Sequence, residues 1–148
     1  MNQPPASLPR SPELERALDR IRVVLSHTSH PGNIGAAARA MKTMGVSRLT
    51  LVNPKTFPHD EAIARSAGAD DILAKAAVCQ SLGEALDGCL YAVAVSARHR
   101  TLGPKPMHAR EAAPEILNLA ADGEVALVFG NETSGLSNDE VQRCQRTV

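Results

Sequence analysis

The chain has 148 residues, in which 16 acidic side chains balance 16 lysines and arginines. This length suits one domain with a single core, and zero net charge means that any nucleic-acid-binding surface must be local. Two phenylalanines, one tyrosine and no tryptophan argue against a base-stacking platform, and three widely spaced cysteines argue against a disulfide framework or a zinc site.

The first 20 residues predict little fixed structure. Residues 1–11 contain three prolines and no hydrophobic run, so we expect a disordered leader rather than a signal peptide. Residues 13–20 have apolar side chains at helical spacing and predict one or two marginal helical turns. No segment is apolar enough to span a membrane. We therefore expect one domain over residues 21–148, in a cytoplasmic protein whose cysteines are reduced.

A strand, a helix and a second strand follow in the first part of this domain. Apolar runs predict strands at 21–26 and 48–52. Between them, apolar side chains at the 3-4 period predict a helix over 33–44, with Asn33 as its N-cap and Gly45 just after its end. This βαβ order indicates a sheet that is at least partly parallel.

The same alternation continues to the end of the chain. Short elements are predicted first, in the order helix, strand, helix, at 61–67, 76–79 and 82–86. Buried strands are predicted at 90–95 and 125–129. A helix starting at Arg110 or Glu111 lies between them, with Pro114 in its first turn, and another begins after Ser137 or Asn138. The fold class is therefore α/β, an open and largely parallel sheet with helices on both faces.

Three loops follow strands of the predicted parallel sheet, at 27–33, 95–105 and 130–137. Ligands of open α/β sheets bind outside the carboxyl ends of the strands. We therefore expect these loops to form one shared site.

The first loop opens the helix that contains Gly35 and Arg39. A glycine inside a helix costs about 1 kcal/mol relative to alanine, which indicates that some group approaches the backbone closely at Gly35. Arg39 lies one turn further on and can lean over that group, although a solvated arginine is the plainer interpretation. His27 and His30 have no third ligand at useful spacing, so we predict no metal site.

The second loop is the strongest local concentration of positive charge. Acidic residues are absent between Arg98 and Arg110. Its cationic side chains are those of Arg98, Arg100, Lys105 and Arg110. Such a group suits the phosphate backbone of RNA.

The third loop begins where the last buried strand stops at Gly130. Gly130 and Gly135 bracket a polar turn, and Glu132 places a charge at its rim. The glycines allow a ligand to approach the backbone, or they only close a tight turn, and the turn alone does not decide between these interpretations.

Two segments resemble motifs of the SpoU branch of the SPOUT methyltransferases. Pro31-Gly-Asn-Ile-Gly-Ala-Ala-Ala-Arg39 is similar to the first motif, and Phe129-Gly-Asn-Glu-Thr-Ser-Gly-Leu136 is similar to the second. Val95-Ser96-Ala97-Arg98 and the basic, proline-containing loop after it resemble the TrmJ-type tRNA 2′-O-ribose methyltransferases in particular. The resemblance extends from residue 21 to residue 148.

This resemblance implies an enzyme that methylates tRNA with S-adenosyl-L-methionine as cofactor, at the ribose of pyrimidine 32 in the anticodon loop, and that works as a homodimer. The cofactor-contacting positions that it implies are Val95, Ser96, Ala97 and Gly130. The polar active-site positions that it implies are Asn33, Arg39 and Glu132. Because a guanidinium has no acceptor and stays protonated, we assign Arg39 to a phosphate and to developing alkoxide charge, with Glu132 orienting Arg39 or Asn33.

The implied fold is of SPOUT type, with a deep trefoil knot near its carboxyl end, an exception to the rule that chains do not thread. The third motif of the family, a strand followed by a Ser-Leu-Asn-rich loop and a helix, would begin just past Val148. The knot-forming segment is therefore expected to be missing from this chain.

Two other classes of protein remain possible from the residues alone. A dinucleotide-dependent oxidoreductase would share the α/β pattern, but no Gly-x-Gly-x-x-Gly follows the first strand. A non-catalytic RNA-binding module would use the basic loop and leave Asn33, Arg39 and Glu132 without a purpose.

Overall fold

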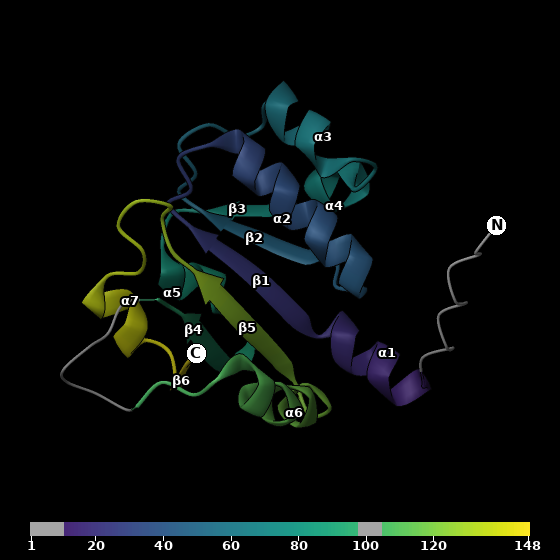
Figure 1. Ribbon diagram of the computed structural model, residues 1–148, viewed down its shortest axis with the longest axis vertical. Helices are drawn as coiled ribbons and strands as arrows, with labels where there is room; N and C mark the ends of the chain where they lie inside the picture. The colour runs from purple at the N-terminus through teal and green to yellow at the C-terminus, as the bar shows by residue number, and fades with distance from the viewer. Residues whose placement is uncertain (1–10, 98–104) are drawn as a thin grey trace.

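A six-stranded parallel sheet forms the centre of the molecule (Figure 1). The structure is a computed structural model that describes residues 11–97 and 105–148. The strand order is β3-β2-β1-β5-β4-β6. The strands are β1 (Ile21–Ser26), β2 (Arg48–Val52), β3 (Ala77–Cys79), β4 (Cys89–Val95), β5 (Glu124–Phe129) and β6 (Arg146–Thr147). The predicted fold class, an open and largely parallel α/β sheet, is confirmed.

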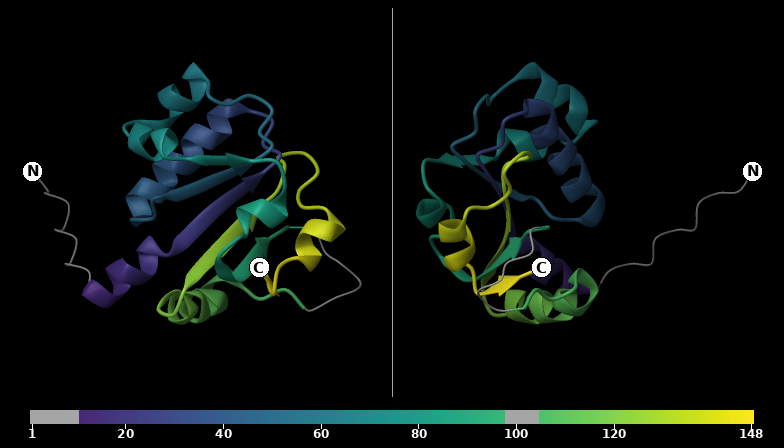
Figure 2. Two further views of the ribbon diagram at one scale, coloured as in Figure 1. Left: turned by 180° about the vertical axis from the view of Figure 1, so that it is seen from behind. Right: turned by 60° about the vertical axis from the view of Figure 1, so that its left-hand side comes forward.

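Helices cover both faces of this sheet, as predicted, but unequally (Figure 2). One face packs against α1 (Pro12–Asp19), α2 (Pro31–Met44), α3 (Asp60–Ser66), α4 (Asp70–Ala74) and α6 (Ala109–Ala120). The other face packs against the short helices α5 (Leu82–Ala85) and α7 (Asn138–Gln142). In β1 the side chains alternate between the two faces, with Val23 in the first core and Val24 in the second. The strand therefore reads as an unbroken apolar run.

Helix α2 begins two residues earlier than the sequence predicts. Pro31 occupies its first turn, and the N-cap is His30, whose side chain makes no capping hydrogen bond. The prediction of Asn33 as the N-cap is wrong, because the fixed φ of Pro31 already suits the helix and draws its start forward. Gly45 ends the helix with a left-handed φ of 80°, as predicted.

Gly35 sets the distance between α2 and α3. A Cβ built on Gly35 would lie 2.1 Å from the carbonyl oxygen of Ala62 in α3. The close approach that the sequence indicates at Gly35 is therefore made by a neighbouring helix.

Three further elements differ from the prediction. Helix α1 is a full helix whose Ala17 is buried, and it packs against α6. Pro114 lies inside α6 rather than in its first turn. Strand β6 starts at Arg146 and pairs with β4, whereas a further strand was expected only past Val148.

Of the leader predicted over residues 1–11, residues 1–10 lie outside the described residues, and Ser11 is the N-cap of α1. Among the helices of residues 11–97 and 105–148, none has the length and apolar character needed to cross a bilayer.

Candidate active site

The loops that follow β1 and β5 meet at one edge of the sheet. The two strands pair in parallel, with Leu25 opposite Phe129, so their carboxyl ends lie side by side. The loop after β5 reaches across to the end of β1 (Figure 1). Two of the three predicted loops are thus brought together.

Glu132 joins these two loops. Its carboxylate accepts hydrogen bonds from the backbone N–H of Ser29, at 3.0 Å from each oxygen, and from that of His30 at 2.9 Å. The side chain of Asn33 also bonds to it. Since His30 provides no side-chain cap, the carboxylate from the distant loop supplies the negative charge that the start of α2 favours.

These contacts keep Glu132 ionised. Partial burial raises the pKa of the carboxyl, but hydrogen bonds from Ser29, His30 and Asn33 together outweigh that effect and hold the pKa below its ordinary value. Both oxygens are engaged by N–H donors. Glu132 is therefore suited to positioning Asn33 and the loop after β1, and is a poor proton acceptor.

Asn131 is a second link between the loops, and the sequence interpretation missed it. Its amide nitrogen donates to the carbonyl of His27 at 2.8 Å and to the hydroxyl of Ser29 at 2.9 Å. Its side-chain oxygen accepts the N–H of Thr133 at 2.9 Å, which closes an Asx turn. An asparagine directly after a strand-ending glycine is a signal for such a turn, but the sequence does not reveal its partners across the sheet.

Gly130 is required by the fold of the turn itself. A Cβ on Gly130 would lie 2.2 Å from the carbonyl carbon of Gly135 and 2.3 Å from the backbone nitrogen of Leu136. The sequence allowed either a ligand close to the backbone or a tight turn at Gly130 and Gly135. The close approach of the backbone at Gly135 and Leu136 to Gly130 is explained by the tight turn. Ser137 and Glu140 then form a capping box that starts α7, in agreement with the predicted N-cap.

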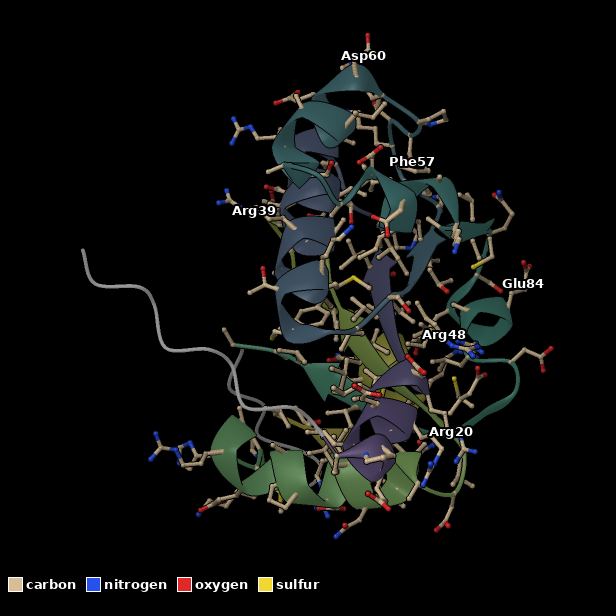
Figure 3. The ribbon with its side chains drawn as sticks, turned by 90° about the vertical axis from the view of Figure 1, so that its right-hand side faces the viewer. Arg20, Arg39, Arg48, Phe57, Asp60 and Glu84 are labelled. Carbon is tan, nitrogen blue, oxygen red and sulfur yellow. The ribbon has the colours of Figure 1, made fainter. Side chains whose placement is uncertain are left out.

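Arg39 lies apart from Asn33 and Glu132. It is exposed on α2, and its side chain points away from the body of the molecule (Figure 3). Within the described residues, no hydrogen bond or ion pair joins its guanidinium to either residue. Of the two partners expected for Glu132, the structure therefore provides Asn33.

The proposed cofactor positions lie on neighbouring strand ends. Val95 ends β4 opposite Phe129, so it stands beside Gly130 at the end of β5. The backbone N–H of Ser96 donates to the carbonyl of Val148 at 2.9 Å, and the exposed Ala97 follows.

The basic loop is described in part. Arg98 and Arg100 lie outside the described residues, whereas Lys105 and Arg110 are exposed, the latter in the first turn of α6. In the described part of the chain, no three histidine, cysteine or acidic side chains are arranged so that they could hold a metal ion.

Three comparisons place the chain among known proteins. Residues 20–148 match the model of the SpoU rRNA methylase family. The tRNA (cytidine/uridine/adenosine-2′-O-)-methyltransferase TrmJ of Pseudomonas aeruginosa is 58% identical over 129 residues, which cover 86% of this chain and 50% of that protein. The tRNA (cytidine/uridine-2′-O-)-methyltransferase TrmJ of Pectobacterium atrosepticum is 51% identical over 131 residues, which cover 88% of this chain and 54% of that protein.

Among solved structures, a probable methyltransferase from Bordetella pertussis superposes with a TM-score of 0.84. It is 42% identical in sequence, and the match covers 90% of this chain and 82% of that one. The chain spans about half the length of the curated relatives it matches.

Proposed function

The chain belongs to the SpoU rRNA methylase family, and from this premise we propose that it transfers a methyl group from S-adenosyl-L-methionine to a ribose 2′-hydroxyl of tRNA. We propose pyrimidine 32 of the anticodon loop as its target, a homodimer as its working form, and the cytoplasm as its location. The observation that carries the proposal is the junction at Glu132. It holds Asn33 beside the strand ends that carry Val95 and Gly130.

Methyl transfer to a hydroxyl is an in-line displacement, so the chain must position and polarise its reactants. When bound, S-adenosyl-L-methionine supplies an electrophilic methyl group on a sulfonium. The residues that would hold it, at the ends of β4 and β5, are Val95, Ser96, Ala97 and Gly130. The Asn33 amide, oriented by Glu132, contacts the ribose hydroxyl.

Arg39 and the basic loop handle the charge of the RNA. The planar guanidinium of Arg39 binds the phosphate next to the reacting ribose and stabilises alkoxide charge as it develops. Its exposure on α2 leaves it accessible to such a phosphate. The remaining phosphate contacts come from Arg98, Arg100, Lys105 and Arg110.

A knot near the carboxyl end is also part of this proposal. The loop after β4 is bonded to β6 at both of its ends, through Ser96 to Val148 and through Met107 to Thr147, each at 2.9 Å. These bonds hold Thr147 and Val148 beside the described ends of that loop, which supports a SPOUT-type arrangement; the knot itself, for which the sequence predicts a segment past Val148, stays a prediction.

The activity is tested by incubating the chain with S-adenosyl-L-methionine and a tRNA transcript, then identifying the nucleosides by mass spectrometry. We expect a 2′-O-methyl pyrimidine nucleoside at position 32, and none from a transcript with a 2′-deoxyribose there. Arg39→Lys should bind S-adenosylhomocysteine normally yet lose most of the turnover, because lysine cannot form a bidentate clamp. Methylation of a base, or RNA binding without transfer, would contradict the proposal, and the second result would favour a non-catalytic RNA-binding module.

A further inference from the structure

A cavity adjoins the candidate active site. Its volume is about 570 Å³, and it lies between the end of β1, the turn after β5 and α7. The polar side chains that line it are those of His27, Asn131, Ser134, Ser137 and Glu140, and we call it the His27 pocket. The proposed cofactor positions are not among the residues that line it.

Asn131 forms the wall between this pocket and the active site. Its amide nitrogen binds the carbonyl of His27 on the pocket side and the hydroxyl of Ser29 on the active-site side. The next residue is Glu132, which holds Asn33. A ligand in the His27 pocket is therefore one side chain away from the group that we propose to contact the ribose.

His27 is held at the pocket in an unfavourable backbone conformation. Its φ is 56°, in the left-handed region that few residues other than glycine adopt. The conformation is fixed on both sides, since the N–H donates to the carbonyl of Val52 at 2.8 Å and the carbonyl accepts from Asn131. Strain that the surroundings enforce in this way occurs most often at functional sites.

The imidazole of His27 is also oriented. Its Nδ1 lies 3.3 Å from the side-chain nitrogen of Asn53, which itself has a φ of 44°. This contact occupies Nδ1, and no described residue bonds to Nε2. The ring thus offers one nitrogen and one aromatic face to a ligand.

The charge of the lining identifies the kind of ligand. Glu140 accepts the backbone N–H of Ser137 at 2.9 Å and the hydroxyl of Ser26. Burial raises the pKa of Glu140, but hydrogen bonds from Ser137 and Ser26 hold it below its ordinary value, so the carboxylate is ionised. A fixed negative charge disfavours a phosphate.

The other groups of the lining suit an uncharged partner. The hydroxyls of Ser134 and Ser137 can each donate and accept hydrogen bonds. Histidine is one of the side chains on which unpaired RNA bases stack. An uncharged, planar, hydrogen-bonding group matches this combination, and in an RNA strand that group is a nucleobase.

We propose that the His27 pocket binds a nucleobase of the RNA, with the His27 ring as its stacking surface. The base belongs to the nucleotide whose ribose is methylated or to an adjacent nucleotide. This inference rests on the proposed function, because it assumes that RNA lies across Asn33 and Glu132.

Two variants remove the ring without disturbing the backbone. His27→Gly and His27→Asn both tolerate a left-handed φ, so both should keep the fold. We expect each to lower kcat/KM and RNA affinity about tenfold on an anticodon stem-loop, the size of one lost base-stacking contact. S-adenosylhomocysteine affinity should not change. Asp122→Asn, exposed at the opposite end of β5, is the matched control and should behave as the wild type.

Abasic substitution at single loop positions shows which base is bound. At the contacted position, loss of the base should lower the RNA affinity of the wild type to that of the two variants. The RNA affinity of the variants should not fall further. Position 32 and each neighbouring position are made abasic in separate RNAs.

Either of two results would overturn the inference: both variants keep RNA affinity within about twofold of the wild type, or both lose S-adenosylhomocysteine affinity. An abasic effect that is equal at every position and in every variant would also contradict it. RNA affinity is measured without turnover. Absence of methyl transfer in the wild type therefore counts against the proposed function, while the affinities still decide on the pocket.

Discussion

At the scale of single residues, two glycines show opposite roles in helices. Alanine at Gly35 would normally stabilise a helix by about 1 kcal/mol. Here its Cβ would lie 2.1 Å from a backbone oxygen of α3, so we expect Gly35→Ala to destabilise the protein by about 2 kcal/mol. In α5, the nearest atom to a Cβ on Gly83 is 3.5 Å away, so Gly83→Ala should be neutral or stabilising. Urea unfolding of both variants measures the difference, and equal effects would show that the α2–α3 contact is not this tight.

Glu132 makes stability depend on pH. Because hydrogen bonds hold its folded-state pKa below the unfolded value, its contribution is present above the unfolded pKa and is lost as the pH falls through the folded pKa. At pH 7 we expect Glu132→Gln to be less stable than the wild type by about 1 kcal/mol, because the substitution removes the charge from these hydrogen bonds. The difference in the free energy of unfolding between the two proteins should narrow as the pH falls through the folded-state pKa of Glu132. Urea unfolding at several pH values tests this, and a gap that stays constant would contradict the assigned hydrogen bonds.

At the scale of elements, one ion pair attaches β6 to α6. Arg146 in β6 donates to the two carboxylate oxygens of Glu115 at 2.9 and 3.2 Å, and the hydroxyl of Tyr91 donates to the same carboxylate at 3.2 Å. Arg146 and Glu115 are about two-thirds buried, so the pair is worth more than an exposed one. It supports the edge on which the proposed cofactor loop rests.

We expect Glu115→Gln to loosen that edge. The N–H groups of Ser96 and Val148, which bond across β4 and β6, should exchange with solvent several-fold faster. Glu13→Gln removes an exposed pair with Arg16 in α1, with side chains 77% and 63% exposed, and should leave these rates unchanged. Hydrogen exchange measured by NMR reports both. Unchanged rates in Glu115→Gln would show that the β4–β6 ladder alone holds the edge.

The elements that could be predicted from sequence are those with strong periodic or buried patterns. β1, β2, β4 and β5 are apolar runs covered on both faces, and α2 has a clear 3-4 period. β6 has only two residues, and α4 lacks the side-chain N-cap that Ser81 provides for the similarly short α5.

The same limit holds within the candidate site. Parallel strand order predicts that the loops after β1 and β5 meet, and they do. The particular bonds from Glu132 to Ser29 and His30 are long-range, and no local pattern encodes them. At the start of α2, Pro31 is a local signal for the first helical turn, whereas the carboxylate of Glu132 that bonds to the N–H of His30 comes from the other loop and has no local signal.

At the scale of the whole molecule, the RNA binding that we propose must depend on local charge, because the net charge is zero. If the four basic residues 98, 100, 105 and 110 each contact a phosphate, log K should fall with log salt with a slope of about −3. We expect Lys105→Ala to reduce that slope by about 1 and to weaken binding equally for all RNA sequences. Lys75→Ala, another exposed lysine, should leave it unchanged. Fluorescence anisotropy over a salt series gives the slopes, and a flat dependence in the wild type would contradict this surface.

The most direct test of the central claim is a calorimetric titration of the chain with S-adenosylhomocysteine, with NADH as the control ligand. We predict saturable binding of S-adenosylhomocysteine, because Val95, Ser96, Ala97 and Gly130 lie together at the ends of β4 and β5. We predict no binding of NADH. Saturable binding of NADH without binding of S-adenosylhomocysteine would contradict the account and would point instead to a dinucleotide-dependent oxidoreductase.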